Sequence, residues 1–81
     1  MVNSVHTKRY RTLLQALIEA RKAKKLSQAD LAEMLGRVQT FVSKYERGER
    51  RLDVIEFIEV AEVLDMDIVK IIRKLKATNE E

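Results

Sequence analysis

The sequence predicts an all-α fold, a compact bundle of five helices with a long first helix. Its 81 residues include no proline, no cysteine and two glycines, and they are rich in the helix formers leucine, alanine, glutamate, lysine and arginine. Apolar residues recur three and four positions apart, the spacing of one helix face. A chain of this length supports a single domain over residues 1–81, which can bury about 60% of its unfolded surface. Without cysteine, the domain has to be held by packing, and disulfides and thiolate zinc sites are excluded.

The first predicted helix runs from about Thr7 to Lys24 and carries one apolar stripe, formed by Tyr10, Leu13, Leu14, Leu17 and Ile18. The second begins after Ser27, whose hydroxyl can cap it. Asp30 lies three residues later, where its carboxylate can complete a capping box. The apolar face of this helix ends at Gly36, a residue that tolerates the positive φ at which helices often stop. A turn is therefore predicted at Gly36.

A third predicted helix follows this turn. Val42 and Tyr45 lie three positions apart on its inner side, whereas Phe41 could close the turn between the helices or lie at the edge of the core. Val38 occupies the position just before the helix, where Ser, Thr or Asp usually provides a cap, and valine has no acceptor to offer. The free amides are therefore left for the Gln28 side chain, for water or for a DNA phosphate.

The outward face of the third helix is polar and carries Gln39, Thr40, Ser43 and Lys44. Glutamine can bond bidentately to adenine, lysine can reach guanine acceptors, and a threonine methyl can pack against a thymine methyl. The serine hydroxyl is short, so Ser43 could instead reach only a phosphate or its own helix backbone. A helix with apolar residues inward and these residues outward is suited to a DNA major groove.

Two further helices complete the predicted bundle. Asp53 and Glu56 repeat the capping-box spacing at the start of a fourth helix, and Asp67 is placed to cap a fifth. The fifth helix carries more apolar surface than one small domain readily covers, through Ile68, Val69, Ile71, Ile72 and Leu75. This excess favours a homodimer, and the alternative is that all five turn inward onto the first helix. Residues 77–81 are expected to form a frayed tail.

The stretch LSQADLAEMLGRVQTFVSKYERG, followed by LDVIEFIEVAEVL, resembles the helix-turn-helix of Cro and phage repressors, the XRE family of bacterial and phage regulators. The resemblance covers about residues 14–71, with the motif at about residues 28–47. It implies a lambda-repressor-like domain and a sequence-specific transcriptional regulator that binds operator half-sites of double-stranded DNA as a homodimer. Repression by occluding a promoter is the simplest mechanism.

The resemblance also implies roles for single residues. Base reading falls on the outward residues of the third helix named above. Gln28 matches a position whose amide touches a backbone phosphate and braces the reading helix, while Arg21 and Glu46 match a structural ion pair. Arginines near the reading helix favour phosphate contacts on grounds of charge. They are Arg37 in the turn and Arg47, Arg50 and Arg51 around Gly48.

The net charge of +3 hides an uneven distribution. Residues 1–51 contain 12 basic and 5 acidic side chains, a balance of +7, whereas residues 52–81 contain 4 basic and 8 acidic ones, a balance of −4. The predicted reading unit belongs to the basic part. This polarity orients the basic side toward DNA and predicts an association that weakens with salt.

Other classes of function find little support in the sequence. One histidine, His6, no glycine-rich phosphate loop and no recognisable carboxylate pair argue against an enzyme, a cofactor or a metal site. The chain has no apolar run near the roughly 20 residues that span a bilayer and no signal-peptide core, so a cytoplasmic protein is expected. No small-molecule effector is evident. The alternative is an antitoxin or adaptor that binds another protein, and it ranks second because only residues 1–6 and 77–81 are expected to be spare.

Overall fold

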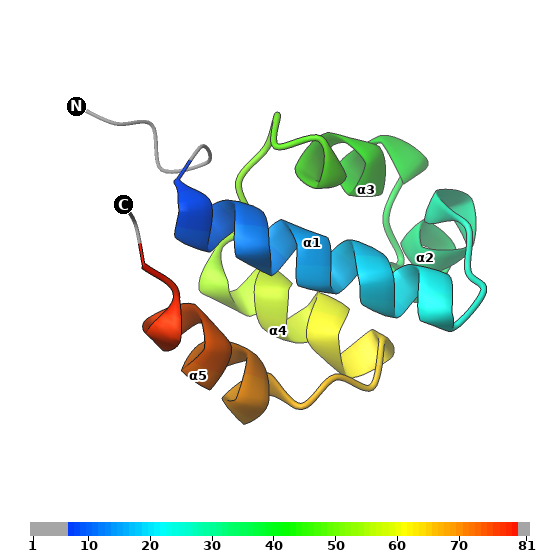
Figure 1. Cartoon of the computed structure of the whole chain (residues 1–81). Helices are drawn as coiled ribbons and strands as arrows, with labels where there is room; N and C mark the ends of the chain where they lie inside the picture. The colour runs from blue at the N-terminus through cyan, green and yellow to red at the C-terminus, as the bar shows by residue number, and fades with distance from the viewer. Residues whose placement is uncertain (1–6, 80–81) are drawn as a thin grey trace.

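A computed structural model describes residues 7–79 of the protein, which form five α-helices and no strand (Figure 1). The helices are α1 (Lys8–Ala23), α2 (Gln28–Leu35), α3 (Gln39–Glu46), α4 (Val54–Val63) and α5 (Ile68–Ala77). The predicted all-α bundle of five helices with a long first helix is confirmed. None of these helices is long and apolar enough to cross a membrane. His6 lies outside the described residues.

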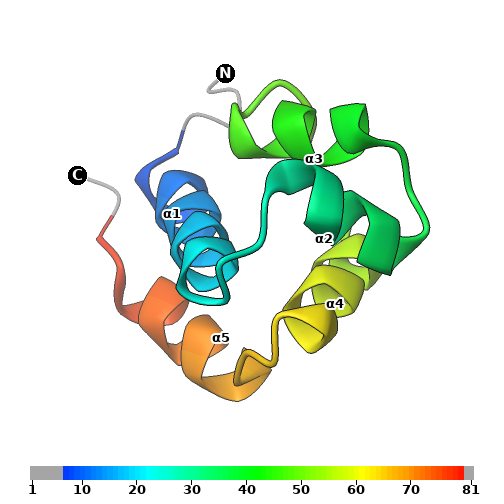
Figure 2. The same cartoon turned by 90° about the vertical axis from the view of Figure 1, so that its right-hand side faces the viewer.

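The five helices enclose one core (Figure 2). α1 runs across the middle of the view in Figure 1 and contacts α3 on one side and α5 on the other. α2 packs against both α3 and α4. The largest side chains at the centre of the core are Leu17, Leu31, Val42, Tyr45 and Val60. Because the core takes buried residues from all five helices, including Phe41, Val42 and Tyr45 of α3, it fixes α3 from its inner side and leaves the opposite side of that helix to solvent.

The predicted helix starts are confirmed at α2 and α4. The Ser27 hydroxyl accepts a hydrogen bond from the Asp30 amide at 2.9 Å, and the Asp30 carboxylate accepts one from the Ser27 amide at 2.9 Å. Asp53 and Glu56 form the same reciprocal pair at the start of α4. Asp67 accepts from the Lys70 amide, as predicted for the cap of α5. These caps set where the helices begin, and thereby the lengths of the turns between them.

Four helices end in the same backbone turn, in which one residue takes a positive φ. Glycine fills that position after α2 (Gly36, φ 69°) and after α3 (Gly48, φ 75°). Lys25 (φ 59°) and Asp65 (φ 56°) fill it after α1 and α4. Each turn closes with amides bonded to carbonyls of the last helical turn, as for Leu26 N to Arg21 O at 3.2 Å. The sequence signals the glycine turns only, because lysine is rare in this conformation and aspartate adopts it only occasionally.

Replacing Lys25 with glycine is expected to raise the free energy of unfolding by about 0.5 to 1 kcal/mol, because glycine takes a left-handed conformation without steric cost and the gain exceeds its unfolded-state entropy. Gly36→Ala is the reciprocal control. Apart from the two adjacent residues, no atom lies within 4 Å of a Cβ added at Gly36, so its expected loss of about 1 kcal/mol reports backbone conformation alone. Urea unfolding measures both, and a loss of stability in Lys25→Gly would contradict this account of the turn.

The end of α5 is joined to the start of α1. Thr78 follows the last helical residue and donates its hydroxyl to the Lys74 carbonyl at 2.9 Å. Arg9 donates to the Thr78 carbonyl at 3.3 Å. Ala77 is helical, although the sequence assigns it to a frayed tail. Of the expected tail, residues 80 and 81 lie outside the described residues.

Candidate nucleic-acid interface

The outward face of α3 is the centre of the candidate interface. Gln39, Thr40 and Lys44 are exposed and Ser43 is half-buried, whereas the intervening apolar residues are buried in the core. The Ser43 hydroxyl donates to the Thr40 carbonyl at 3.3 Å. Ser43 thus adopts one of the two arrangements left open by the sequence, a bond to its own helix backbone. The helix therefore presents an amide, a hydroxyl with its methyl, and an ammonium to solvent.

A buried ion pair holds the C-terminal end of α3. The Nε of Arg21 on α1 donates to Glu46 Oε2 at 2.8 Å, and its Nη2 donates to Oε1 at 3.1 Å. The side chains are 10% and 5% exposed. Arg21 also donates to the Leu26 carbonyl at 2.8 Å, and Gln28 on α2 donates to Glu46 Oε1 at 2.8 Å. The hydrogen bond to Glu46 raises the pKa of Arg21 above its ordinary value. The pair therefore ties α1, α2 and α3 together.

Tyr45 lies beside this pair in the core. Its ring meets that of Phe41 edge-on, with centroids 5.5 Å apart. Among residues 7–79 its hydroxyl has no hydrogen-bond partner. Burial raises the pKa of the Tyr45 hydroxyl far above its usual value, so the group stays protonated.

The start of α3 has no side-chain cap. Val38 occupies the N-cap position and, as predicted, provides no side-chain acceptor for the free amides. It is 70% exposed. The Gln28 side chain, one of the partners that the sequence allows for these free amides, instead donates through its amide nitrogen to Glu46 at the other end of the helix. The first residues of α3 therefore take their position from contacts other than a cap.

Those contacts centre on Phe41. Its ring is buried, and the guanidinium carbons of Arg37 and Arg50 lie over it at 4.4 and 4.9 Å from the centroid. Arg50 donates bidentately to Glu56, Nη1 to Oε1 at 2.9 Å and Nη2 to Oε2 at 2.7 Å. Arg37 Nη1 lies 3.6 Å from Glu56 Oε2. We call these four side chains, Arg37, Phe41, Arg50 and Glu56, the arginine clamp.

Glu56 is buried, and it serves the clamp and the cap of α4 at once. Besides Arg50, it accepts a hydrogen bond from the Asp53 amide at 3.0 Å. The hydrogen bonds from Arg50 and from the Asp53 backbone lower the pKa of Glu56 to about 2. The carboxylate is therefore ionised at any physiological pH. The sequence predicts the capping box of Glu56 with Asp53 but not its ion pair with Arg50.

The remaining arginines lie on the loop between α3 and α4. Arg47 forms an exposed ion pair with Glu49, Nε to Oε2 at 2.9 Å. Arg51 is exposed, with its guanidinium carbon 5.5 Å from the centroid of the Tyr10 ring. The Tyr10 hydroxyl accepts a hydrogen bond from the Leu52 amide at 2.9 Å, which anchors the loop to α1. All four arginines near α3 thus have a partner within the protein, and for Arg51 that partner is the Tyr10 ring.

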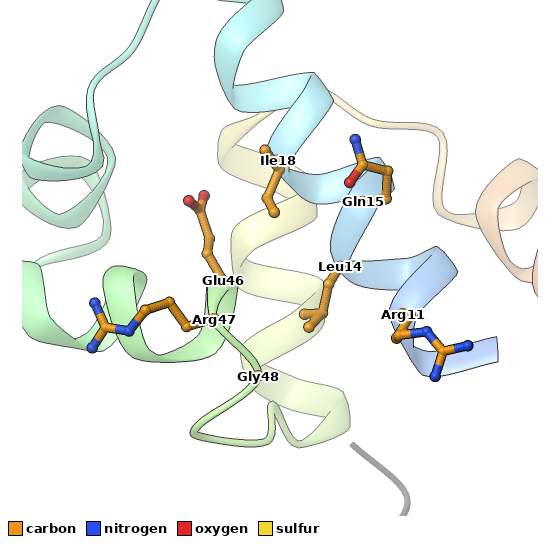
Figure 3. A pocket seen from close by; sticks show the side chains of 7 residues that line it. All are labelled: Arg11, Leu14, Gln15, Ile18, Glu46, Arg47 and Gly48. Atoms are coloured by element: carbon orange, nitrogen blue, oxygen red, sulfur yellow. The ribbon is translucent and has the colours of Figure 1, made fainter. Parts of the chain in front are cut away.

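A small pocket of about 230 Å³ opens between α1 and the C-terminal end of α3 (Figure 3). Leu14 and Ile18 point into the space between the two helices, while the guanidinium groups of Arg11 and Arg47 lie on its opposite sides. In the part of the chain that the structure describes, no three His, Cys, Asp or Glu side chains gather in a way that could hold a metal ion.

Comparison with known proteins gives three findings. A family model described as helix-turn-helix matches residues 17–71. An uncharacterised HTH-type transcriptional regulator, y4dL of Sinorhizobium fredii, is 37% identical over 63 residues, which cover 78% of this chain and 32% of that protein. The chain therefore spans about a third of the length of this relative. A solved structure of an XRE-family like protein from Pseudomonas syringae pv. tomato superposes with a TM-score of 0.83 at 47% identity, covering 91% of this chain and 90% of that one.

Proposed function

The chain belongs to the XRE family of helix-turn-helix transcriptional regulators, and we propose that it represses transcription by binding two operator half-sites as a homodimer. The observation that carries the proposal is the outward face of α3, which is polar and exposed while the helix itself is held by a buried ion pair. A fixed helix with free donors and acceptors is what base reading in a major groove requires. We assign it neither catalysis nor a cofactor.

Base reading falls in this proposal on Gln39, Thr40 and Lys44, with Ser43 in a lesser part. The first three are exposed, so a base edge can reach them without any rearrangement of the protein. Ser43 already donates its hydroxyl to the Thr40 carbonyl, and its oxygen keeps only acceptor capacity for DNA. Gln39 and Lys44 therefore carry most of the sequence information, because their side chains are longer and offer several donors.

Phosphate contacts are proposed for Gln28, Arg37, Arg47, Arg50 and Arg51, with unequal weight. Arg51 is exposed, and its guanidinium lies over the Tyr10 ring. Arg47 shares its charge with Glu49, in a pair that is 55% and 54% exposed and so exchanges easily for a phosphate. The side chains of Arg37 and Arg50 are 37% and 38% exposed, and Glu56 already offsets part of their charge. Arg51 is therefore the strongest phosphate candidate.

The homodimer is supported by apolar residues that the fold leaves uncovered. Val69 and Ile72 on α5 are 59% and 45% exposed, and Val54 and Ile55 on α4 are exposed as well. Of the five apolar residues of α5, Ile71 is buried and Ile68 and Leu75 are partly buried against the core, so the inward face accounts for three of them. Exposed apolar surface on a helix of a small domain favours association with a second copy. The two reading helices would then lie about one turn of DNA apart, on the order of 34 Å.

Selection from random duplexes tests the function together with the dimer. The wild-type protein is expected to enrich a two-fold symmetric sequence and to sediment on it as two chains per duplex. Ile72→Lys should remove the second chain, because it places a charge in the apolar contact. Met34→Lys changes an exposed apolar residue on α2 and should leave the stoichiometry at two. Absence of DNA binding at low salt, with a stoichiometric partner protein in the preparation, would favour the adaptor instead.

A further inference from the structure

The start of α3 carries two of the proposed reading residues and has no side-chain cap. Gln39 and Thr40 are its first two residues, and the preceding Val38 provides no cap. The Arg21–Glu46 ion pair lies at the opposite end of the helix. A base contact is lost when a side chain moves by a fraction of an ångström, so some other contact has to fix this end.

The arginine clamp is suited to this task. Phe41 directly follows Gln39 and Thr40, and two guanidinium groups cover its ring. Guanidinium over an aromatic face is favourable, and a bidentate carboxylate fixes the guanidinium in its plane. Glu56 supplies that carboxylate from α4, and its own position is fixed by the capping box with Asp53. The chain of contacts runs from α4 through Arg50 to the first turn of α3.

We infer that Glu56 is a positioning residue for DNA reading, which acts through Arg37 and Arg50 on Phe41 to hold Gln39 and Thr40 in place of the missing cap. This inference rests on the proposed function and adds to it a residue that does not itself touch DNA. It also gives a role to Glu56, a carboxylate that is buried beside a basic surface. In the clamp, the Glu56 carboxylate offsets part of the positive charge of Arg37 and Arg50, and the same contacts fix the start of α3.

Positioning and plain electrostatics predict opposite results for Glu56→Gln. Removing a negative charge near DNA strengthens binding to every sequence. Loss of positioning weakens binding to the preferred sequence alone. Glu59→Gln is the matched control, because it makes the same charge change on the same helix. Its side chain is 52% exposed and lies 3.8 Å from Arg37, outside the bidentate contact.

The experiment compares affinities for the duplex that wild-type protein selects and for a shuffled duplex. We expect Glu56→Gln to lower the ratio of the two affinities about tenfold without weakening the shuffled duplex, and Glu59→Gln to change the ratio less than twofold. Arg50→Lys keeps the charge, loses the bidentate contact and should lower the ratio in the same way, so the test does not depend on one variant folding. Equal shifts on both duplexes in Glu56→Gln, or an equal loss of ratio in Glu59→Gln, would overturn the inference.

Hydrogen exchange in the free protein separates this inference from the proposed function. The Phe41 amide donates to the Val38 carbonyl at 3.0 Å, and the Glu49 amide donates to the Lys44 carbonyl at 2.9 Å at the far end of the helix. Glu56→Gln is expected to speed exchange at Phe41 at least threefold and to leave exchange at Glu49 unchanged. Equal acceleration at both would indicate general destabilisation and contradict positioning. If the wild-type protein prefers no duplex, the proposed function fails, while this measurement still decides whether the clamp holds α3.

Discussion

Replacing Glu46 with alanine is expected to lower the free energy of unfolding by about 3 to 5 kcal/mol, because it leaves the Arg21 guanidinium buried without its carboxylate. Arg21 keeps only its bond to the Leu26 carbonyl, and Gln28 loses its acceptor. Small domains are stable by about 5 to 15 kcal/mol, so this one change removes a large part of the total. Urea unfolding followed by circular dichroism measures the loss.

Two further variants separate burial from charge. Glu49→Ala removes the carboxylate of an exposed ion pair with Arg47, and its effect on stability should be small because solvent screens that pair. The double variant Arg21→Met with Glu46→Leu removes both buried charges and should recover much of the loss of Glu46→Ala. If Glu46→Ala were no more destabilising than Glu49→Ala, the ion pair would not be what holds α3 to α1.

The second large effect concerns DNA. Replacing Lys44 or Gln39 with alanine is expected to cost about 1 to 3 kcal/mol of binding free energy on the preferred duplex, the range of a good bidentate base contact. Both side chains are exposed, so their removal leaves the fold intact and the loss reports binding. Fluorescence anisotropy titrations against the preferred duplex and against single-base variants measure it. A uniform loss on all of these duplexes would contradict base reading.

Arg51→Ala is the matched contrast for these two variants. A phosphate contact carries no sequence information, so its loss should weaken all duplexes alike and reduce the salt slope by about 1. Arg51 suits this contrast better than Arg50. Arg50 is bonded to the buried Glu56, and its removal would disturb the clamp as well as any phosphate contact. A change in base preference in Arg51→Ala would place that residue among the reading residues.

The parts of the fold that could be predicted depend on residues close together in the sequence. The capping boxes of Ser27 with Asp30 and of Asp53 with Glu56 involve residues three apart, and both are present. Gly36 was predicted as a helix end for the same reason, and its φ of 69° confirms it. Local spacing determines these contacts whatever the tertiary structure, and a single sequence contains that spacing.

The unpredicted parts depend on residues brought together by packing. The sequence predicts a capping box for Glu56 and a phosphate contact for Arg50. Neither prediction indicates that the two side chains bind each other. The sequence allows two positions for Phe41. Its burial beneath two arginines depends on the turn before α3, which carries Arg37, and on the loop after α3, which carries Arg50. Lys25 and Asp65 hold positive φ because the turn requires it at those positions.

The candidate site could be predicted from the sequence in part. A pattern of inward apolar and outward polar residues predicts which side chains of α3 reach solvent, and Gln39, Thr40 and Lys44 are exposed. The contact of Arg21 with Glu46 spans 25 positions and was expected from a family resemblance rather than from spacing. Which bases the exposed residues contact depends on the DNA, and that assignment stays a prediction.

Selection from random duplexes with wild-type protein and with Gln39→Ala, side by side, tests most directly whether the outward face of α3 reads DNA. We expect the wild-type protein to select a two-fold symmetric sequence. Gln39→Ala should select the same sequence except at one position in each half-site, where the preference relaxes. An unchanged sequence in Gln39→Ala would contradict the assignment of base reading to this face.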